Sequence, residues 1–490
     1  MKTLQSFKAR TGEPYGAPLM ATTPEQLDAT VEASYDAFTS WQASSGEARS
    51  ALLHALADSL EGDRNALVTL ADEETALGPV RLNGELDRTA FQLRRFADMC
   101  LRGVPFESID DPAVAGAPPV GHPAMVLQRV PLGPVAMFSA SNFPFAFSVL
   151  GGDTASALAA GCSVVIKAHT AHLLLSNRVF GLIQKVLEAQ KLPAGLISMI
   201  QGGGSDVGVR LVRHPLIAAG AFTGSTRGGS ALQAEANSRP RPIPFYGELG
   251  SINPLIAMPA ILAIKGAELA TTLAGSITLG CGQFCTSPGV IVLMNDPASD
   301  AFVESLTTAL KALQPHAMLT PGIRQAFDNG VAHLAASGVK VLVQEEGNAE
   351  APRPFLAQTD ATNFIVNPEL REEVFGPSAI IVRANSVAEV LQVLKAVGGS
   401  LTVTLWGAEQ ESADTKALVR GAMAIAGRVL FSGVPTGVAV TAAQQHGGPW
   451  PSSTQPMTTS VGDTALNRFL RPVCIQDAPA WLLARSGQPC

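Results

Sequence analysis

The sequence of 490 residues lacks the features that would place it in a membrane, on nucleic acid or outside the cell. Residues 1–8 form no apolar leader, and the longest apolar stretch, 252–264, stops at Lys265 before it reaches the length of a membrane span. The net charge of −7 disfavours nucleic acid and anionic membranes as partners. We therefore expect a cytoplasmic protein that acts on a small molecule, with no nucleic acid and no membrane among its partners.

Cysteine is scarce, with six residues scattered over the chain, which is too few for a disulfide scaffold. Free thiols in a reducing compartment are the expected state. Cys281 and Cys285 are close enough in sequence to face each other on a turn. A zinc site of that kind needs further cysteine or histidine at short spacing, and the next histidine is His316. We therefore predict no metal site.

Charged side chains are scarce as well. They make up 15% of the chain, against 47% for hydrophobic residues, which indicates large buried surfaces, including subunit interfaces. A chain of this length exceeds what one hydrophobic core can organise, so we expect two to four domains.

What the sequence does have is a regular alternation of helical and strand patterns. In the first hundred residues, Thr23-Pro24-Glu25-Gln26 predicts a helix start with a capping box. From Pro134 short β-type runs are each followed by a longer amphipathic segment, which predicts right-handed βαβ crossovers, a parallel sheet and a Rossmann-like unit. The predicted strands are 135–138, 164–166, 197–200 and 219–222, and the predicted helices are 48–60, 66–77, 84–97, 145–160, 172–190, 205–212 and 227–236.

A second α/β series begins after Glu248. It contains a predicted helix at 260–278, a strand at 290–293 and further alternation to Leu430. Two doubly wound domains with a cleft between them would place Glu248 and Cys285 near their junction. Two extended segments, 120–131 and 466–476, fit neither domain.

Three residues carry groups suited to one reaction. Cys285 lies in the glycine-rich turn Leu279-Gly280-Cys281-Gly282-Gln283-Phe284-Cys285-Thr286, where exposed backbone N–H groups would lower the pKa of its thiol and make it a nucleophile. Asn142 offers an amide N–H to a developing oxyanion, and Glu248 lies in apolar surroundings, which would raise its pKa for work as a base. Taken singly, each has a simpler explanation: an inert buried thiol, a turn asparagine and a glutamate that caps a loop.

Taken together, the thiol, the carboxylate and the amide resemble the aldehyde dehydrogenase superfamily in their order and context, and the resemblance spans nearly the whole chain. It implies an α/β fold of two doubly wound Rossmann-like domains plus a small β oligomerisation arm. Cys285 would be the nucleophile, Glu248 the base that activates water, and Asn142 the oxyanion donor. The expected division is N-terminal helices and a cofactor-binding domain at 1–117 and 132–247, a catalytic domain at 248–445, and an arm at 118–131 and 462–480 that pairs with a neighbouring subunit of a homodimer or homotetramer.

The resemblance also implies a dinucleotide site, although the chain has no usable G-x-G-x-x-G pattern. The segment Thr223-Gly224-Ser225 forms a predicted strand-to-helix turn and would lie under the pyrophosphate and nicotinamide region. Glu373 would bind the nicotinamide ribose, and Phe375 would pack beside it.

Three further residues bear on the choice between NADP and NAD. Lys167, at the carboxyl end of a predicted strand, would contact the adenosine ribose. NAD-preferring relatives often carry glutamate three residues later, where this chain has Thr170. An uncharged hydroxyl, with Arg210 as a second cation, suits NADP and leaves NAD use open. Simple surface exposure would explain Arg210 equally well.

Within the superfamily the sequence is most similar to the 2-oxoglutarate semialdehyde (2,5-dioxopentanoate) dehydrogenases, in segments 82–94, 282–289, 445–451, 459–462 and 468–473. The implied reaction is NADP-dependent oxidation of that aldehyde to 2-oxoglutarate through a cysteine hemithioacetal and a thioester. The far carboxylate of such a substrate needs a cation or several donors, and Arg88 and Gln92 are candidates by position. A solvated helix face would explain both equally.

Two alternatives stay open. An NADP-dependent dehydrogenase for long-chain or broad-range aldehydes would line its tunnel with Phe143, Phe147 and other apolar side chains, with no cation near the mouth. A catalytically silent member would serve as a structural or binding protein, although the intact set of Asn142, Glu248 and Cys285 argues against it.

Overall fold

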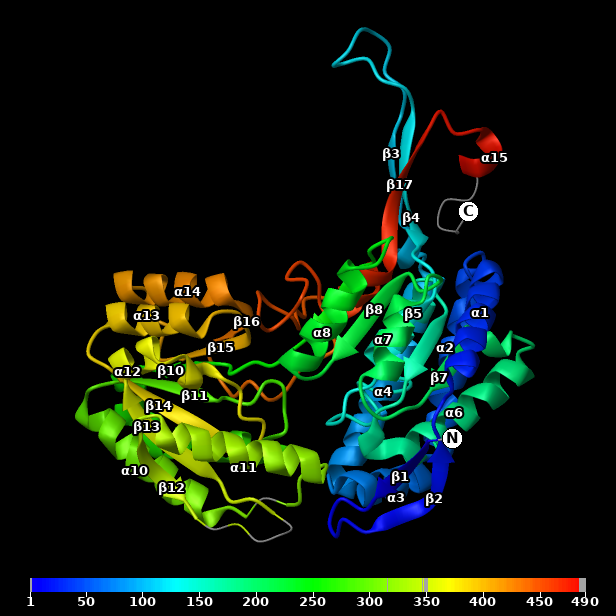
Figure 1. The fold of residues 1–490 in the computed structure, drawn as a ribbon. Coiled ribbons are helices and arrows are strands. Elements are labelled where there is room, and N and C mark those ends of the chain that lie inside the picture. Colours follow the sequence, from blue (N-terminus) through cyan, green and yellow to red (C-terminus); the bar gives the residue numbers. More distant parts are fainter. Residues whose placement is uncertain (1, 315, 346, 348–350, 484–490) are drawn as a thin grey trace.

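The computed structural model describes residues 2–314, 316–345, 347 and 351–483. Figure 1 shows two α/β bodies, each built on its own sheet, and a narrow β arm that stands away from both. The predicted α/β class with a β arm is confirmed. Of the six cysteines, Cys490 lies outside the described residues, and the other five are free thiols.

The N-terminal part begins with a hairpin and four helices, of which α1 packs with one face of the first sheet and α2, α3 and α4 lie in the core on its other face. Thr23 caps the first helix in the predicted capping box, because its hydroxyl accepts from Gln26 N while the Gln26 side chain accepts from Thr23 N. The elements are β1 (Thr3–Phe7), β2 (Pro14–Met20), α1 (Pro24–Trp41), α2 (Gly46–Gly62), α3 (Arg64–Thr75) and α4 (Pro79–Leu101).

The first sheet is parallel, with the strand order β7-β6-β5-β8-β9. Because all strands of this sheet run in the same direction, Phe138, Lys167 and Glu248 lie at the carboxyl ends of their strands, on one side of the sheet. Open α/β sheets bind ligands at these ends. Its elements are β5 (Val135–Phe138), α5 (Gly152–Ala159), β6 (Val164–Lys167), α6 (Leu173–Ala189), β7 (Ile197–Ile200), α7 (Asp206–Arg213), β8 (Ala219–Thr223), α8 (Thr226–Asn237) and β9 (Phe245–Glu248).

The helix predicted at 145–160 is wrong in its first half, because α5 begins only at Gly152. The preceding backbone follows turns, and a buried carboxylate accounts for them. Glu85 Oε1 accepts from the backbone N–H groups of Phe145 at 2.8 Å and Ala146 at 3.0 Å. The apolar side chains of this stretch are buried in turns that keep a few isolated backbone bonds, such as Phe147 N to Phe143 O, and no continuous helix.

The second sheet has the order β12-β13-β14-β11-β10-β15-β16 and is parallel except for the edge strand β12. Every residue of β14 and β15 is buried, as expected for strands with helices on both faces. The strands are β10 (Leu255–Ala257), β11 (Val290–Met294), β12 (Lys340–Gln344), β13 (Phe355–Asp360), β14 (Ser378–Ala384), β15 (Ser400–Trp406) and β16 (Ala426–Leu430). The helices are α9 (Pro259–Thr278), α10 (Pro297–Ala312), α11 (Pro321–Ala336), α12 (Ala361–Val366), α13 (Val387–Val397) and α14 (Ala413–Ile425).

Helix α9 and the turn after it, Pro259–Gly282, are long and apolar enough to cross a membrane by length and composition. The same test is passed by core helices of globular proteins. Leu262, Leu273 and Ile277 of α9 pack in the core that covers one face of the second sheet.

The arm is an antiparallel sheet of β17 (Leu470–Gln476), β4 (Met125–Pro131) and β3 (Ile109–Asp111). Its limits differ from the predicted 118–131 and 462–480. Strand β3 pairs with β4 although it lies before residue 118. Residues Asp463–Phe469 form a short 3-10 helix whose Leu466 and Phe469 pack in the first core. After the arm a short helix, α15 (Ala480–Leu483), follows.

A buried ion pair ties this C-terminal segment to the first body. Arg468 Nη2 lies 2.5 Å from Asp153 Oδ1 in α5, and the side chains are only 3% and 9% exposed. Asp153→Ala would leave the Arg468 charge buried without its partner. We expect this change to lower the free energy of unfolding by about 3–5 kcal/mol, measured by chemical denaturation.

The matched control is Asp28→Ala, which removes the partner of the exposed Arg210. Water solvates Arg210 after that change, so its effect on unfolding should be much smaller. Equal losses in the two variants would mean that burial of the Arg468 pair is energetically unimportant.

Candidate active site

A strained turn presents Cys285 between α9 and β11. Gly280, Cys281 and Gly282 have φ of 58°, 59° and 67°, in the left-handed region. A Cβ on Gly282 would lie 2.2 Å from the backbone of Gly376, so only glycine fits there. Asn253 fixes the far side of the turn, because its Nδ2 donates to Cys285 O at 2.8 Å.

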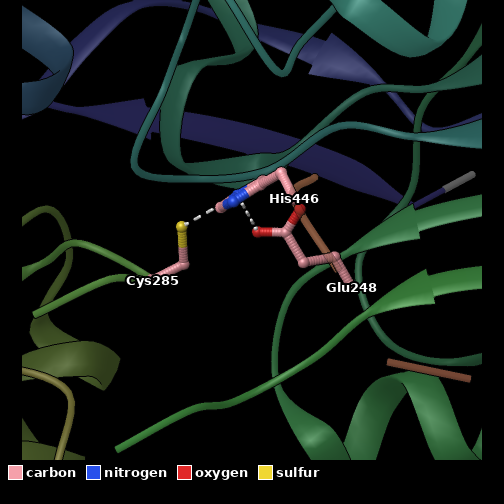
Figure 2. A group of neighbouring side chains, drawn as sticks. All are labelled: Glu248, Cys285 and His446. Atoms are coloured by element: carbon pink, nitrogen blue, oxygen red, sulfur yellow. Dashed lines mark hydrogen bonds and ion pairs between the residues drawn. The ribbon is translucent and has the colours of Figure 1, made fainter. Parts of the chain in front are cut away.

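Glu248 ends β9 and reaches a buried cluster of side chains (Figure 2). Its carboxylate accepts a 2.6 Å hydrogen bond at Oε2 from Ser460 Oγ, and its Oε1 lies 2.9 Å from His446 Nε2. His446 Nε2 is in turn 3.6 Å from Cys285 Sγ. The predicted nucleophile and the predicted base therefore meet through one imidazole.

His446 and Ser460 belong to the site although the sequence alone did not point to them. Both lie in segments that carry the resemblance, 445–451 and 459–462, but nothing in their spacing points to Glu248 or Cys285. Only the tertiary structure brings His446 and Ser460 next to Glu248. Ser460 N donates to His446 O at 2.8 Å, so the two residues form one unit against the end of β9.

The thiol of Cys285 does not have the lowered pKa expected from its turn. Burial, and then the negative charge of Glu248, raise the pKa of Cys285 well above its ordinary value, and Arg88 opposes this only weakly. The N–H groups of the turn do not outweigh these two effects. In this state the side chain is a thiol, and its proton must pass to a neighbouring group before it can attack.

The pKa of Glu248 also departs from expectation, in the opposite direction. Burial raises it, but the adjacent imidazole of His446 and the hydroxyl of Ser460 together outweigh burial, so the pKa of Glu248 is lowered. The side chain is therefore a carboxylate throughout the neutral range. It can still act as a base, with a driving force that its neighbours reduce.

Asn142 follows β5 and lies at the same sheet edge. Its Nδ2 donates to Gln283 O at 2.9 Å, which fixes the amide beside the cysteine turn. Arg81 of α4 holds the asparagine from behind through a 2.6 Å bond from Nη2 to Asn142 O. The structure thus brings the three candidate catalytic residues Asn142, Glu248 and Cys285 into the lining of one cavity.

That cavity has a volume of about 870 Å³ and lies along the edge of the first sheet. Thr223 and Glu248 are register partners on β8 and β9, so cofactor and base positions are neighbours. Ser225 caps α8, with its hydroxyl accepting from Gly228 N at 3.2 Å. Of the predicted cofactor residues, the cavity is lined by Lys167, Thr170, Thr223, Gly224, Ser225, Glu373 and Phe375.

Arg210 is the exception among the predicted cofactor residues. Its guanidinium is half-exposed and pairs with Asp28 of α1, and it is absent from the described lining of the cavity. The expectation that it supplies a second cation for NADP is therefore wrong. Lys167 remains, and within the described part of the chain its ammonium group has no hydrogen bond or ion pair. Burial lowers the pKa of Lys167.

The four predicted substrate residues are not in the described lining of this cavity and form a group beside the catalytic side chains, which do line it. Arg88 lies over the ring of Phe147 at 5.4 Å, and that ring is 6.2 Å from the ring of His446. Phe143 packs edge-on against Phe147 at 5.3 Å. Gln92 lies one turn after Arg88 on α4, so both point the same way.

Buried donors in this group have no protein partner. Arg88 Nε, Arg88 Nη2 and Gln92 Nε2 make no hydrogen bond to the described residues. Burial lowers the pKa of Arg88, and the nearby carboxylates of Glu85 and Glu248 oppose that shift without cancelling it. Arg428 of β16, which sequence analysis missed, is a second cation near Cys285 with an unpartnered Nε. Buried cationic donors that no described residue satisfies indicate a site for an anion.

Comparison with known proteins agrees with this geometry. The model of the aldehyde dehydrogenase family matches residues 2–449. The chain is 44% identical to α-ketoglutaric semialdehyde dehydrogenase 2 of Azospirillum brasilense, over 99% of this chain and 93% of that protein. It is 40% identical to α-ketoglutaric semialdehyde dehydrogenase of Acinetobacter baylyi, over 99% and 94%.

Solved structures share the fold at low identity. Aldehyde dehydrogenase 21 of Physcomitrella patens, in complex with the reaction product succinate, superposes with a TM-score of 0.81 at 19% identity, over 98% of this chain and 96% of that one. A 1-pyrroline-5-carboxylate dehydrogenase from Thermus with bound NAD gives 0.81 at 20% identity, over 97% and 90%. The chain described here belongs to the aldehyde dehydrogenase family and is an oxidoreductase that acts on aldehydes.

Proposed function

We propose that this enzyme oxidises 2-oxoglutarate semialdehyde (2,5-dioxopentanoate) to 2-oxoglutarate and prefers NADP as the acceptor. The observation that carries the substrate assignment is the guanidinium of Arg88, whose Nε and Nη2 are buried without a partner among the described residues. A substrate carboxylate would satisfy both donors in a bidentate pair. The names of the two relatives at 44% and 40% identity support the same substrate.

The first half of the reaction forms a thioester on Cys285. The thiol proton passes to the hydrogen-bonded pair of Glu248 and His446, whose Nε2 lies 3.6 Å from Cys285 Sγ, and the thiolate attacks the aldehyde carbon to give a hemithioacetal. Asn142 Nδ2 and the Cys285 backbone N–H donate to the oxyanion that forms. The bound dinucleotide supplies the hydride acceptor. Loss of hydride from the hemithioacetal leaves the thioester.

The second half hydrolyses that thioester. Glu248 removes a proton from the attacking water, and the carbon–sulfur bond then breaks to release the carboxylic acid and Cys285. Ser460 and His446 hold the Glu248 carboxylate in place. Their contacts lower the pKa of Glu248, so the base stays ionised down to mildly acidic pH.

The lining of the large cavity fits a dinucleotide. Ser225 and Gly228 line the cavity at the start of α8, where the positive end of the helix dipole favours phosphate. Lys167 offers a cation at the end of β6 and Glu373 a carboxylate across the cavity. An uncharged Thr170 in place of glutamate leaves nothing beside Lys167 to repel a 2′-phosphate, which supports NADP.

An apolar cluster favours the second candidate, a dehydrogenase of long-chain or broad-range aldehydes. Phe143, Phe147, Val438, Val440 and Val461 pack together near the catalytic side chains. Buried Arg88 in the same place would be costly for an enzyme of purely apolar aldehydes, because its unpaired charge would face hydrocarbon. The unpaired cation therefore favours the dioxo acid.

We also propose a cytoplasmic homodimer or homotetramer assembled through the arm. The arm stands out from the body in Figure 1 and exposes Ile109 and Leu127 of its own strands to solvent. Exposed apolar side chains on a strand arm support pairing with another subunit. Five free thiols support a reducing compartment.

The substrate assignment is tested by Arg88→Met with 2,5-dioxopentanoate and hexanal as paired substrates. Loss of the cation should lower kcat/KM for the dioxo acid by about 100-fold, because a buried charge pair is lost, and leave hexanal unchanged or improved. Arg94→Met is the control, since this arginine of the same helix faces outward and pairs with Asp58 and Glu61. If the wild-type enzyme instead has the higher kcat/KM for hexanal, the second candidate function, oxidation of long-chain or broad-range aldehydes, is the correct one.

The role of Glu248 is tested by Glu248→Gln. The amide cannot take a proton from water, so hydride transfer should continue while thioester hydrolysis slows by about 100-fold or more. Rapid mixing should show a burst of about one NADPH per active site followed by a slow steady state. Normal steady-state turnover would remove Glu248 from the mechanism.

The cofactor preference is tested by Thr170→Glu. A carboxylate three residues from Lys167 should repel the 2′-phosphate and lower kcat/KM for NADP by at least about tenfold, while NAD use is kept or improved. Thr170→Gln has the same size without the charge and should leave the NADP to NAD ratio nearly unchanged. An equal ratio of kcat/KM for NADP to that for NAD in wild type and Thr170→Glu would mean that the 2′-phosphate of NADP does not bind beside residue 170.

A further inference from the structure

Cys285, His446 and Glu248 form a cluster whose geometry resembles a metal site. One possible ligand atom of each, the thiol sulfur, the imidazole Nε2 and a carboxylate oxygen, lies within 4.8 Å of both others. Ordinary zinc–ligand distances in a tetrahedron put sulfur and nitrogen about 3.6 Å apart, and nitrogen and oxygen about 3.4 Å. The observed sulfur–nitrogen separation is 3.6 Å, the nitrogen–oxygen separation is 2.9 Å, and sulfur and oxygen lie within 4.8 Å, so a zinc ion would bind after the carboxylate moves away from the imidazole.

Neighbouring side chains fix the orientation of these three residues, as outer hydrogen bonds fix the ligands in metal sites. Ser460 Oγ bonds Glu248 Oε2, which leaves Oε1 turned toward His446 (Figure 2). That buried Oε1 lies 2.9 Å from His446 Nε2, so the oxygen and the nitrogen that would bind the metal already face each other. Thr459 Oγ1 accepts from His446 N at 2.8 Å and fixes the histidine backbone.

We propose that this cluster is an inhibitory site for Zn²⁺ or a similar thiophilic divalent cation. The proposal rests on the catalytic roles given to Cys285 and Glu248. Binding converts the thiol to a zinc-bound thiolate and releases one proton to solvent, while His446 binds through Nε2 and Glu248 through Oε1. Water completes the fourth position. No oxidation or reduction takes place.

The ligand set determines which cations the site takes. A thiolate and an imidazole select zinc and similar metals over magnesium and calcium, which prefer oxygen ligands. One thiolate and one carboxylate balance the two charges of Zn²⁺. Arg88 and Arg428 lie near Cys285 and weaken cation binding. Bound zinc would occupy the nucleophile and the base together, so activity should stop until a chelator removes it.

The test measures metal binding and inhibition separately on the full-length enzyme after chelator treatment. Co²⁺ titration should give the thiolate-to-cobalt absorption band at one equivalent per chain, and Zn²⁺ should abolish the band. Oxidation of 2,5-dioxopentanoate in buffered free Zn²⁺ should fall to near zero at the same occupancy and return with chelator. Mg²⁺ at the same concentrations should have no effect.

His446→Phe keeps the ring and removes the ligand nitrogen, so cobalt and zinc should bind at least about tenfold more weakly. If that variant does not fold, as judged by circular dichroism, Glu248→Gln tests the same site through its weaker amide ligand. Cys474→Ser is the control: this thiol on β17 is exposed and far from the cluster in sequence, so its loss should leave zinc affinity unchanged.

The outcomes separate this inference from the proposed function. Equal zinc affinity in wild type and His446→Phe would overturn the site and indicate simple binding to a thiol. An enzyme that oxidises aldehyde at full rate in excess Zn²⁺ would overturn it as well, while its catalytic function stands. Stoichiometric cobalt binding at Cys285 without oxidation of any aldehyde would support the metal site and remove the proposed function.

Discussion

The catalytic arrangement depends on one segment, 446–460, that crosses from the second body to the end of β9 in the first. Its backbone continues the first sheet, because Leu249 N donates to Ser452 O at 2.8 Å and Thr454 N donates to Gly247 O at 3.0 Å. Glu248 and Ser453 form a β-bridge at the same place. These bonds bring the base, its hydrogen-bond donor and the imidazole together, although more than 180 residues separate β9 from the segment in sequence.

The same region contains charged side chains whose burial lowers the stability of the fold. Ionised groups with few partners are expensive to bury, and stable proteins remove most of them. Here the guanidinium of Arg88 keeps unpartnered nitrogens near the Glu248 carboxylate and the Cys285 thiol. The helix that carries Arg88 also carries Arg81 and Glu85, which fix the asparagine loop. One face of α4 therefore both builds the site and supplies its unpaired charge.

Local patterns predicted most elements because their causes are local. Strands such as 135–138 and the capping box at Thr23 depend on neighbouring residues, and the structure has both where they were expected. The helix predicted at 145–160 failed because a carboxylate 60 residues earlier, that of Glu85, takes its first backbone N–H groups. The limits of the arm failed for a similar reason, since β3 is defined by its pairing with β4 and has no strong pattern of its own.

The sequence by itself determined the α/β class and the order of strands and helices, and it predicted Cys285, Glu248 and Asn142 as the candidate catalytic residues, because motif and periodicity are properties of short stretches. Only the tertiary structure decided the charge states and the partners. It reversed the expected directions of both pKa shifts, since burial and the approach of Glu248 act on Cys285, while His446 and Ser460 act on Glu248. In the tertiary structure Arg210, which was expected in the cofactor site, lies at the surface and pairs with Asp28. Coulombic interaction and desolvation depend on distance in space, which sequence spacing does not encode.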